Sequence, residues 1–179
     1  MLVSDVEKQV LRLLDEVSVT DYAERMYRMI DEAQREIATT WGFIRRACTL
    51  EVTAGEPTEL PANFYAMEKA DREDFEIVPM EVGGQWKNGI IFSEGGTVRI
   101  LYKAYPTEVT ESDAAMEIEL APEYHTALCC YVAALTQHNE YDKRAYQIFM
   151  ERYNNSIASV QHAKQMTGKA RVVNYGRII

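Results

Sequence analysis

The spacing of the hydrophobic residues changes twice along the chain, and this change constrains the fold more than any other feature. Near the N-terminus apolar side chains recur every three or four residues, as in amphipathic helices. Residues 46–106 instead hold short alternating runs, and the helical spacing returns after Pro122. The order predicts an α+β protein, mainly helical, and its 179 residues can bury a core without a metal or a disulfide.

Two helices are expected before residue 46. Ser4 and Glu7 have the spacing of a capping box, which places the start of a short amphipathic helix at Ser4. A second helix begins near Ser18 or Thr20 and runs towards Trp41. Its expected buried stripe is Tyr22, Met26, Met29, Ile30, Ala33 and Ile37.

The central segment is expected to form a small antiparallel sheet of three to five strands. Gly83-Gly84 and Gly95-Gly96 lie between alternating runs and are interpreted as hairpin turns. The loop VGGQWKNG presents Trp86 and Lys87 as candidate contacts with another protein. The alternative is that Trp86 packs on the base of its own hairpin, because tryptophan is enriched both in cores and at interfaces.

Two further helices are expected after an acidic connector, with Pro122 as a first helical residue and Asp142 as a cap for the last helix. The terminal helix pairs need partners for their apolar faces, which predicts a four-helix bundle with the sheet as an insertion. The expected divisions are 1–45 and 122–166 for the bundle, 46–106 for the sheet, 107–121 for the connector and 167–179 for an extended C-terminal arm. The expected stripes are Tyr124, Leu128, Tyr131, Val132 and Leu135, then Ala145, Phe149, Tyr153, Ile157 and Val160.

The C-terminal arm differs in charge from the rest of the chain. The formal net charge is -9, yet the last 17 residues hold four basic side chains and no acidic one, which leaves 15 bases against 28 acids in the remainder. Such an arm is suited to docking on an acidic surface with apolar pockets, and the alternative is a merely soluble terminus. The candidate docking residues are Lys169, Arg171, Val172, Val173, Tyr175, Arg177, Ile178 and Ile179.

Motifs of enzymes and of metal or cofactor sites are missing from the sequence. Glycine-rich phosphate loops, GxSxG, HExxH and paired CxxC do not occur, so no catalytic, cofactor or metal residues are assigned. The acidic clusters are more typical of solvated loops than of the carboxylate pair of a glycosidase. Glycosidase activity is therefore the least favoured function. The three cysteines, Cys48, Cys129 and Cys130, are interpreted as small buried hydrophobes. The three histidines, His125, His138 and His162, are widely spaced in surroundings that need no ligand, and His125 is interpreted as a surface or boundary residue.

Composition also bears on the surroundings of the protein. No run of about 18 apolar residues and no signal-peptide pattern occurs, so a cytosolic or particle-bound protein without a membrane span is expected. The acidity argues against stable binding of nucleic acid, which needs basic surface to displace phosphate counterions.

The chain resembles the head-to-tail adaptor (head-completion or connector) proteins of tailed bacteriophages over roughly residues 20–162, both in the order of its elements and in the sequence motifs within them. A helix runs into Trp41, a strand leads to a turn from Ala54-Gly55 to Leu60-Pro61, and Phe64 follows. A strand then ends in an aromatic residue before Pro106. The next helix starts at Leu120-Ala121-Pro122-Glu123-Tyr124-His125, where the family's LPxxYH-like pattern has one inserted Ala.

The resemblance implies a structural role without enzymatic activity. Copies would form a dodecameric ring beneath the portal, extend the DNA channel without specific DNA binding, and offer a platform to tail nozzle, hub or tail-completion proteins. The protein would lie at the head–tail interface of the virion after assembly in the host cytoplasm, with the arm on the portal or an adjacent subunit and Trp86 and Lys87 on a tail component or a neighbour. The alternatives are a tail-tube or minor head protein, or a non-phage helical binding or regulatory protein.

Overall fold

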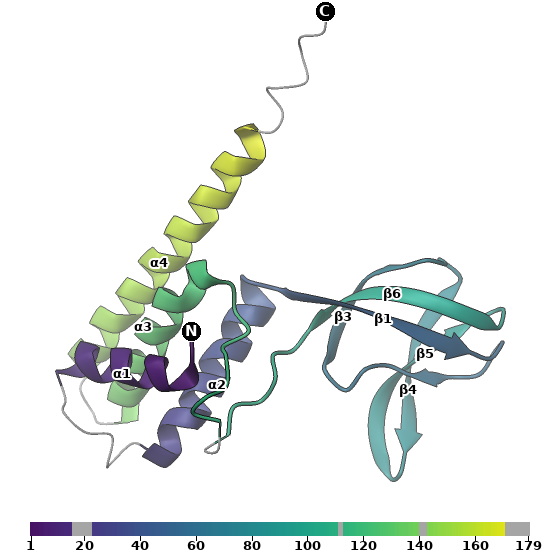
Figure 1. Cartoon of the computed structure of the whole chain (residues 1–179), viewed down its shortest axis with the longest axis horizontal. Helices are drawn as coiled ribbons and strands as arrows, with labels where there is room; N and C mark the ends of the chain where they lie inside the picture. Colours follow the sequence, from purple (N-terminus) through teal and green to yellow (C-terminus); the bar gives the residue numbers. More distant parts are fainter. Residues whose placement is uncertain (16–22, 111–112, 140–142, 171–179) are drawn as a thin grey trace, which may run out of the picture. The chain divides into compact units, whose positions relative to one another are not determined.

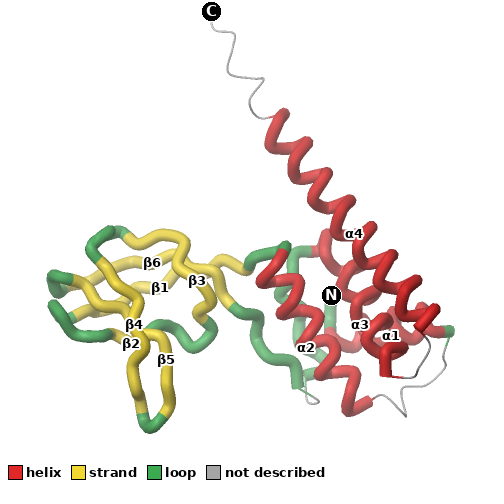
Figure 2. Tube along the Cα trace, turned by 180° about the vertical axis from the view of Figure 1, so that it is seen from behind, coloured by secondary structure: helices red, strands yellow, loops and turns green. Residues whose placement is uncertain are grey.

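The computed structural model describes residues 1–15, 23–110, 113–139 and 143–170. Within them the chain forms two compact units, one from Met1–Gly42 with Glu108–Ile179 and the other from Phe43–Thr107. All the described helices belong to the first unit and all the strands to the second (Figures 1 and 2). Each unit is therefore built from its own kind of secondary structure.

The helical unit is organised around its third helix. This helix is apolar on nearly all sides, with Leu128, Cys129, Val132 and Ala133 all buried, so it must be surrounded by the others. The three other α-helices and the short 3₁₀ helix each pack against it. The helices of this unit are α1 (Val3–Leu14), α2 (Ala23–Thr40), the short 3₁₀ helix η1 (Pro122–Tyr124), α3 (His125–Asn139) and α4 (Lys143–Ala170).

The outer helices bury one stripe each. In α2 the predicted stripe from Met26 to Ile37 is buried, and in α4 the predicted Phe149, Tyr153 and Ile157 are buried. Helix α4 extends to Ala170, so residues 167–170 are helical. Tyr22 and Asp142 lie outside the described residues.

The first helix begins earlier than its predicted capping box. Helix α1 starts at Val3, and the carboxylate of Asp5 accepts the backbone N–H of Leu2 at 3.2 Å. The N–H groups of Val3 and Ser4 donate to carbonyls of the connector, on Met116 at 2.9 Å and on Ala114 at 3.1 Å. The connector therefore satisfies donors that a helix start leaves without an intrahelical partner.

The β unit consists of two three-stranded antiparallel sheets, in the orders β1-β6-β3 and β2-β5-β4. Gly83-Gly84 forms the predicted hairpin turn between β4 and β5. The Gly95-Gly96 prediction is wrong, because β5 and β6 belong to different sheets and Gly96 pairs with Val52. The strands are β1 (Ile44–Val52), β2 (Thr58–Glu59), β3 (Phe64–Ala70), β4 (Phe75–Val82), β5 (Gln85–Phe92) and β6 (Gly96–Ala104).

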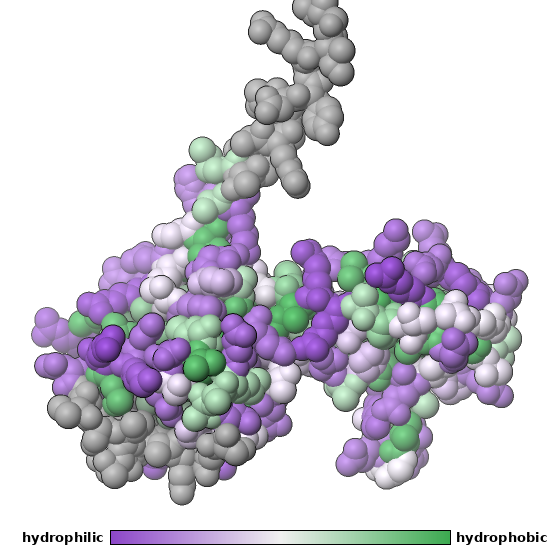
Figure 3. All heavy atoms as spheres, in the orientation of Figure 1, coloured by the Kyte–Doolittle hydropathy of each residue, from purple (hydrophilic) through white to green (hydrophobic). Residues whose placement is uncertain are grey.

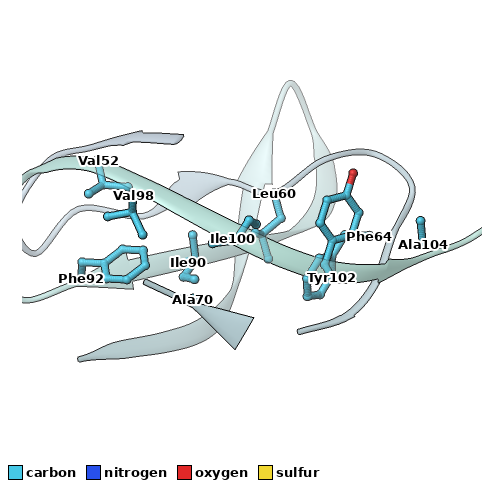
Figure 4. Close-up of a cluster of buried hydrophobic side chains, with 10 residues drawn as sticks. All are labelled: Val52, Leu60, Phe64, Ala70, Ile90, Phe92, Val98, Ile100, Tyr102 and Ala104. Carbon is cyan, nitrogen blue, oxygen red and sulfur yellow. The ribbon is translucent and has the colours of Figure 1, made fainter. Parts of the chain in front are cut away.

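Side chains from both sheets form one hydrophobic core (Figure 4). Strand β6 shows the alternation that produces it, since Val98, Ile100, Tyr102 and Ala104 are buried while Arg99 is exposed. The core residues are Val52, Leu60, Phe64, Ala70, Ile90, Phe92, Val98, Ile100, Tyr102 and Ala104.

The prediction of a mainly helical four-helix bundle carrying a small sheet is wrong. The central segment forms six strands in two sheets with a core of their own, and the protein is an α+β chain in which strands are a major part. Within the helical unit, α3 is buried among the other helices. The predicted C-terminal arm lies outside the described residues from position 171 onward.

Candidate functional site

The β4–β5 hairpin carries the most exposed large apolar side chain of the β unit, Trp86. Val82 pairs with Gln85, which leaves Gly83 and Gly84 as a two-residue loop with φ of 60° and 79°. Positive φ at both positions is the requirement of a type I′ turn, and glycine meets it without strain. The hairpin projects from the rest of its unit, and apolar surface is visible along it (Figures 1 and 3).

Trp86 lies one residue beyond the turn and is 74% exposed. It therefore does not pack on the base of its own hairpin, and its contact with another protein stays a prediction. The side chains of Ile77 and Trp86 share one face, because Ile77 pairs with Ile90 and Glu81 pairs with Trp86. Ile77 is 41% exposed, so this face carries apolar surface that the unit does not cover.

Lys87 has a partner within its own chain. Its ammonium group forms an ion pair with Glu59, which lies on the neighbouring strand β2. This pair joins β5 to β2 on the face opposite Trp86. A contact between Lys87 and another protein stays a prediction.

The base of the hairpin is held by Arg72. Its Nε donates to Asp74 at 3.0 Å and its Nη1 to the carbonyl of Glu94 at 2.9 Å, while its guanidinium lies 5.3 Å from the centroid of the Phe92 ring. Hydrogen bonds from Arg72 and then from Ser93 hold the pKa of Asp74 far below its ordinary value. The two ends of the hairpin are thus tied together at the surface.

Strand β4 is an edge strand, since it pairs only with β5. An open edge offers unpaired backbone groups, and proteins commonly blunt such edges with proline and charge. Here Pro79 lies in the middle of β4, and the exposed Glu76 and Glu81 lie on either side of it. The β4 edge is therefore protected against pairing with arbitrary strands of other chains, and it carries negative charge.

A polar cluster in the helical unit is centred on Tyr124, which is fully buried. Its hydroxyl donates to the carbonyl of Trp41 at 2.8 Å and accepts from Lys164 at 2.8 Å and from Gln161 at 3.4 Å. Lys164 also pairs with Glu123 at 3.4 Å. The pKa of Lys164 is raised, because these interactions outweigh the lowering by partial burial. One buried tyrosine thus joins the end of α2 to the last turns of α4.

The sequence indicated Tyr124 only as a member of an apolar stripe. Its polar role depends on residues 83 and 40 positions away in the chain, and no local pattern contains them. The same holds for Gln34, which is fully buried and accepts the backbone N–H of Glu119 at 3.1 Å.

Glu117, in the described part of the connector, is poorly placed to act as the general acid of a glycosidase. The side chain of Glu117 is 80% exposed and lies 3.7 Å from the N-terminal amine. A general acid needs a protected environment that favours its protonated form. Among the described residues no group of three or more His, Cys, Asp or Glu side chains is arranged to hold a metal ion.

The cysteines and the histidines whose side chains are described lie in ordinary structural positions. Cys129 and Cys130 are buried, as predicted, and burial raises the pKa of the Cys129 thiol to about 12. Cys48 is half-buried, and burial raises its thiol pKa as well. His125 contacts the carbonyl of Leu120 at 3.0 Å, and His162 is exposed. The side chain of His138 lies outside the described set.

The predicted docking arm lies largely outside the described residues. Positions 171–179 fall outside the described residues, and for Lys169 only the helical backbone is described. No helix in the described portion of the chain has both the length and the apolarity to span a membrane.

Residues 1–174 match the SU10 adaptor protein family, and the chain belongs to it. It is therefore a bacteriophage structural adaptor and a virion component. None of the curated proteins compared with the chain matches it.

Proposed function

We propose that the chain is the subunit of a homo-oligomeric ring, of twelve copies, that joins the portal to the tail. The ring extends the DNA channel and provides the platform on which tail nozzle, hub or tail-completion proteins dock. Membership of the adaptor family over residues 1–174 is the observation that carries this proposal. Assembly takes place in the host cytoplasm, and the ring occupies the head–tail interface of the virion.

The charge of the chain supports the channel role. A formal net charge of -9 gives a surface that repels phosphate, so DNA passes without specific binding. A ring also requires two different faces on each subunit, because a heterologous contact joins one patch to another. The β4–β5 hairpin and the end of α4 belong to different units and provide such unlike elements.

We assign the contact with a tail component or neighbour to Trp86 and Lys87, and the contact with the portal or an adjacent subunit to the arm. The indole is the most exposed of the large apolar side chains in the described residues. Removing Gln85–Asn88 is expected to leave the helical unit folded and to abolish tail attachment. Loss of the helical circular dichroism signal in that deletion would show a structural role instead.

The ring proposal is tested by mixing the purified chain with its portal and imaging the mixture by negative stain. A ring of added density on one end of the portal is expected, and the mass of the complex gives the copy number. A chain that joins tail components but never the portal would favour the alternative of a tail-tube or minor head protein.

Truncation of the C-terminus tests whether the arm is needed for ring formation on the portal. A chain ending at Met166 lacks the last helical residues, whereas a chain ending at Ala170 keeps all of α4. Both are expected to remain helical and to fail to form rings on the portal. If both build rings as the full chain does, the arm is not a docking element.

A further inference from the structure

The open edge of β4 and the C-terminal segment 171–179 are complementary in charge and in length. Around the hairpin, Glu73, Glu76 and Glu81 are exposed, while Arg72, which precedes β4, and Lys87, on β5, are already paired with Asp74 and Glu59. The C-terminal segment RVVNYGRII contains Arg171 and Arg177 and no acid. An anionic edge and a cationic segment therefore occur on the same chain.

The two elements also match in extent. Strand β4 has 8 residues, and the segment after α4 has nine positions, 171–179. At about 3.3 Å per residue both span roughly 26 to 30 Å when extended. The segment is rich in residues that favour strands, namely Val172, Val173, Tyr175, Ile178 and Ile179.

Apolar side chains are available on both faces of the hairpin. Ile77, Pro79 and Trp86 share one face, and the half-buried Val78, Met80 and Val82 share the other. In an extended strand Val173, Tyr175 and Ile179 would share one face, and Val172 and Ile178 the other. A strand added at this edge would thus extend apolar surface on both sides.

We propose that the C-terminal segment of one copy adds as a strand to the β4 edge of a second copy, where the negative charge of the edge attracts the arginines of the segment. Backbone hydrogen bonds supply the affinity in such strand addition, and side chains supply the selection. The acidic edge rejects a second β4, whose carboxylates would face its own, and accepts the cationic segment. This inference rests on the proposed ring and identifies one contact between its subunits.

The contact is head-to-tail, because the donor follows α4 and the acceptor is in the β unit. A head-to-tail contact leaves one donor and one acceptor free until a ring closes. Closure then strengthens each contact, since the last one forms within a single assembly.

Charge reversal in the full-length chain tests the contact. The variants are an edge double, E76K with E81K, a segment double, R171E with R177E, and the quadruple that combines them. Glu76 and Glu81 are exposed, and positions 171 and 177 fall outside the described residues, so the described folds are expected to persist by circular dichroism. A matched control reverses two exposed charges elsewhere, Lys8→Glu with Glu56→Lys.

The measurement is the molar mass from sedimentation equilibrium across protein concentration. The wild type and the control are expected to associate, each double to require at least tenfold higher concentration, and the quadruple to recover. Trp86→Ala is expected to weaken association while leaving the midpoint of unfolding unchanged.

Three results would overturn the inference. The first is association of both doubles equal to that of the wild type, and the second is a quadruple as weak as the doubles. The third is a wild-type chain that stays monomeric up to about 1 mM, where even a weak contact would be populated. Rings that still form on the portal in any of these cases would leave the proposed function standing, with the segment on the portal.

Discussion

The ammonium group of Lys164 lies against both polar and aromatic parts of Tyr124, with Nζ 2.8 Å from the hydroxyl oxygen and 4.5 Å from the ring centroid. Lys164 belongs to the last turns of α4, and the same hydroxyl donates to the carbonyl of Trp41 at the end of α2. Tyr124 therefore fixes the terminal helix to the point where the chain leaves the helical unit.

Replacing Tyr124 by Phe is expected to lower the free energy of unfolding of the helical unit by about 1 to 3 kcal/mol, because a buried hydroxyl with three partners is lost. Urea unfolding followed at the helical circular dichroism signal measures the change. Tyr65→Phe is the matched control, since Tyr65 is 40% exposed, and it should stay within about 0.5 kcal/mol of the wild type. If both variants change the free energy of unfolding equally, the hydroxyl of Tyr124 does not stabilise the helical unit in this way.

A methyl group at position 42 has no room. A Cβ added to Gly42 would lie 2.8 Å from Cε2 of Tyr124, so Gly42→Ala is expected to cost about 1 to 3 kcal/mol in unfolding free energy. At Gly89 the nearest atom is Sδ of Met80 at 2.7 Å, and a flexible methionine can move aside. Thermal unfolding should therefore show a larger loss for Gly42→Ala than for Gly89→Ala, and the reverse order would contradict this account.

Phe149 is 7% exposed on the face of α4 that packs on α3, whereas Ile148 is 43% exposed. Phe149→Ala is expected to cost about 3 to 5 kcal/mol and Ile148→Ala less than about 1 kcal/mol, because only the first leaves a cavity. Chemical denaturation of the pair gives the comparison. A loss below about 1 kcal/mol for Phe149→Ala would place that side chain at the surface.

Cys129 is expected to make the helical unit sensitive to alkali. Burial raises the pKa of its thiol in the folded chain to about 12, above the unfolded value of roughly 8.5. The stability that follows is complete below pH 8.5 or so and is lost as pH rises towards 12, by up to about 1.4 kcal/mol per pH unit.

The test compares the pH dependence of unfolding in Cys129→Ala and Cys48→Ala between pH 8 and 10.5. Only the first is expected to flatten the alkaline decline markedly, since Cys48 is half-buried. Parallel declines in the wild type and Cys129→Ala would show that other groups, such as the buried Tyr153 with its raised pKa, cause the sensitivity.

Local spacing was sufficient to predict the helical stripes and one hairpin turn. The stripe from Met26 to Ile37, the stripe through Phe149, Tyr153 and Ile157, and the Gly83-Gly84 turn are encoded within a few residues each. Periodicity and positive-φ glycine pairs depend on backbone geometry that needs no distant partner. Family membership likewise follows from the chain alone, over residues 1–174.

Tertiary structure decided how those elements combine. The alternation in β6 did not reveal that its buried residues face a second sheet, or that Gly95-Gly96 crosses between sheets, because strand pairing depends on partners far along the chain. The burial of α3 on nearly all sides and the hydrogen bonds of Tyr124 likewise arise from contacts between remote segments. Sequence patterns specify which face of an element is apolar, and only packing determines what covers that face.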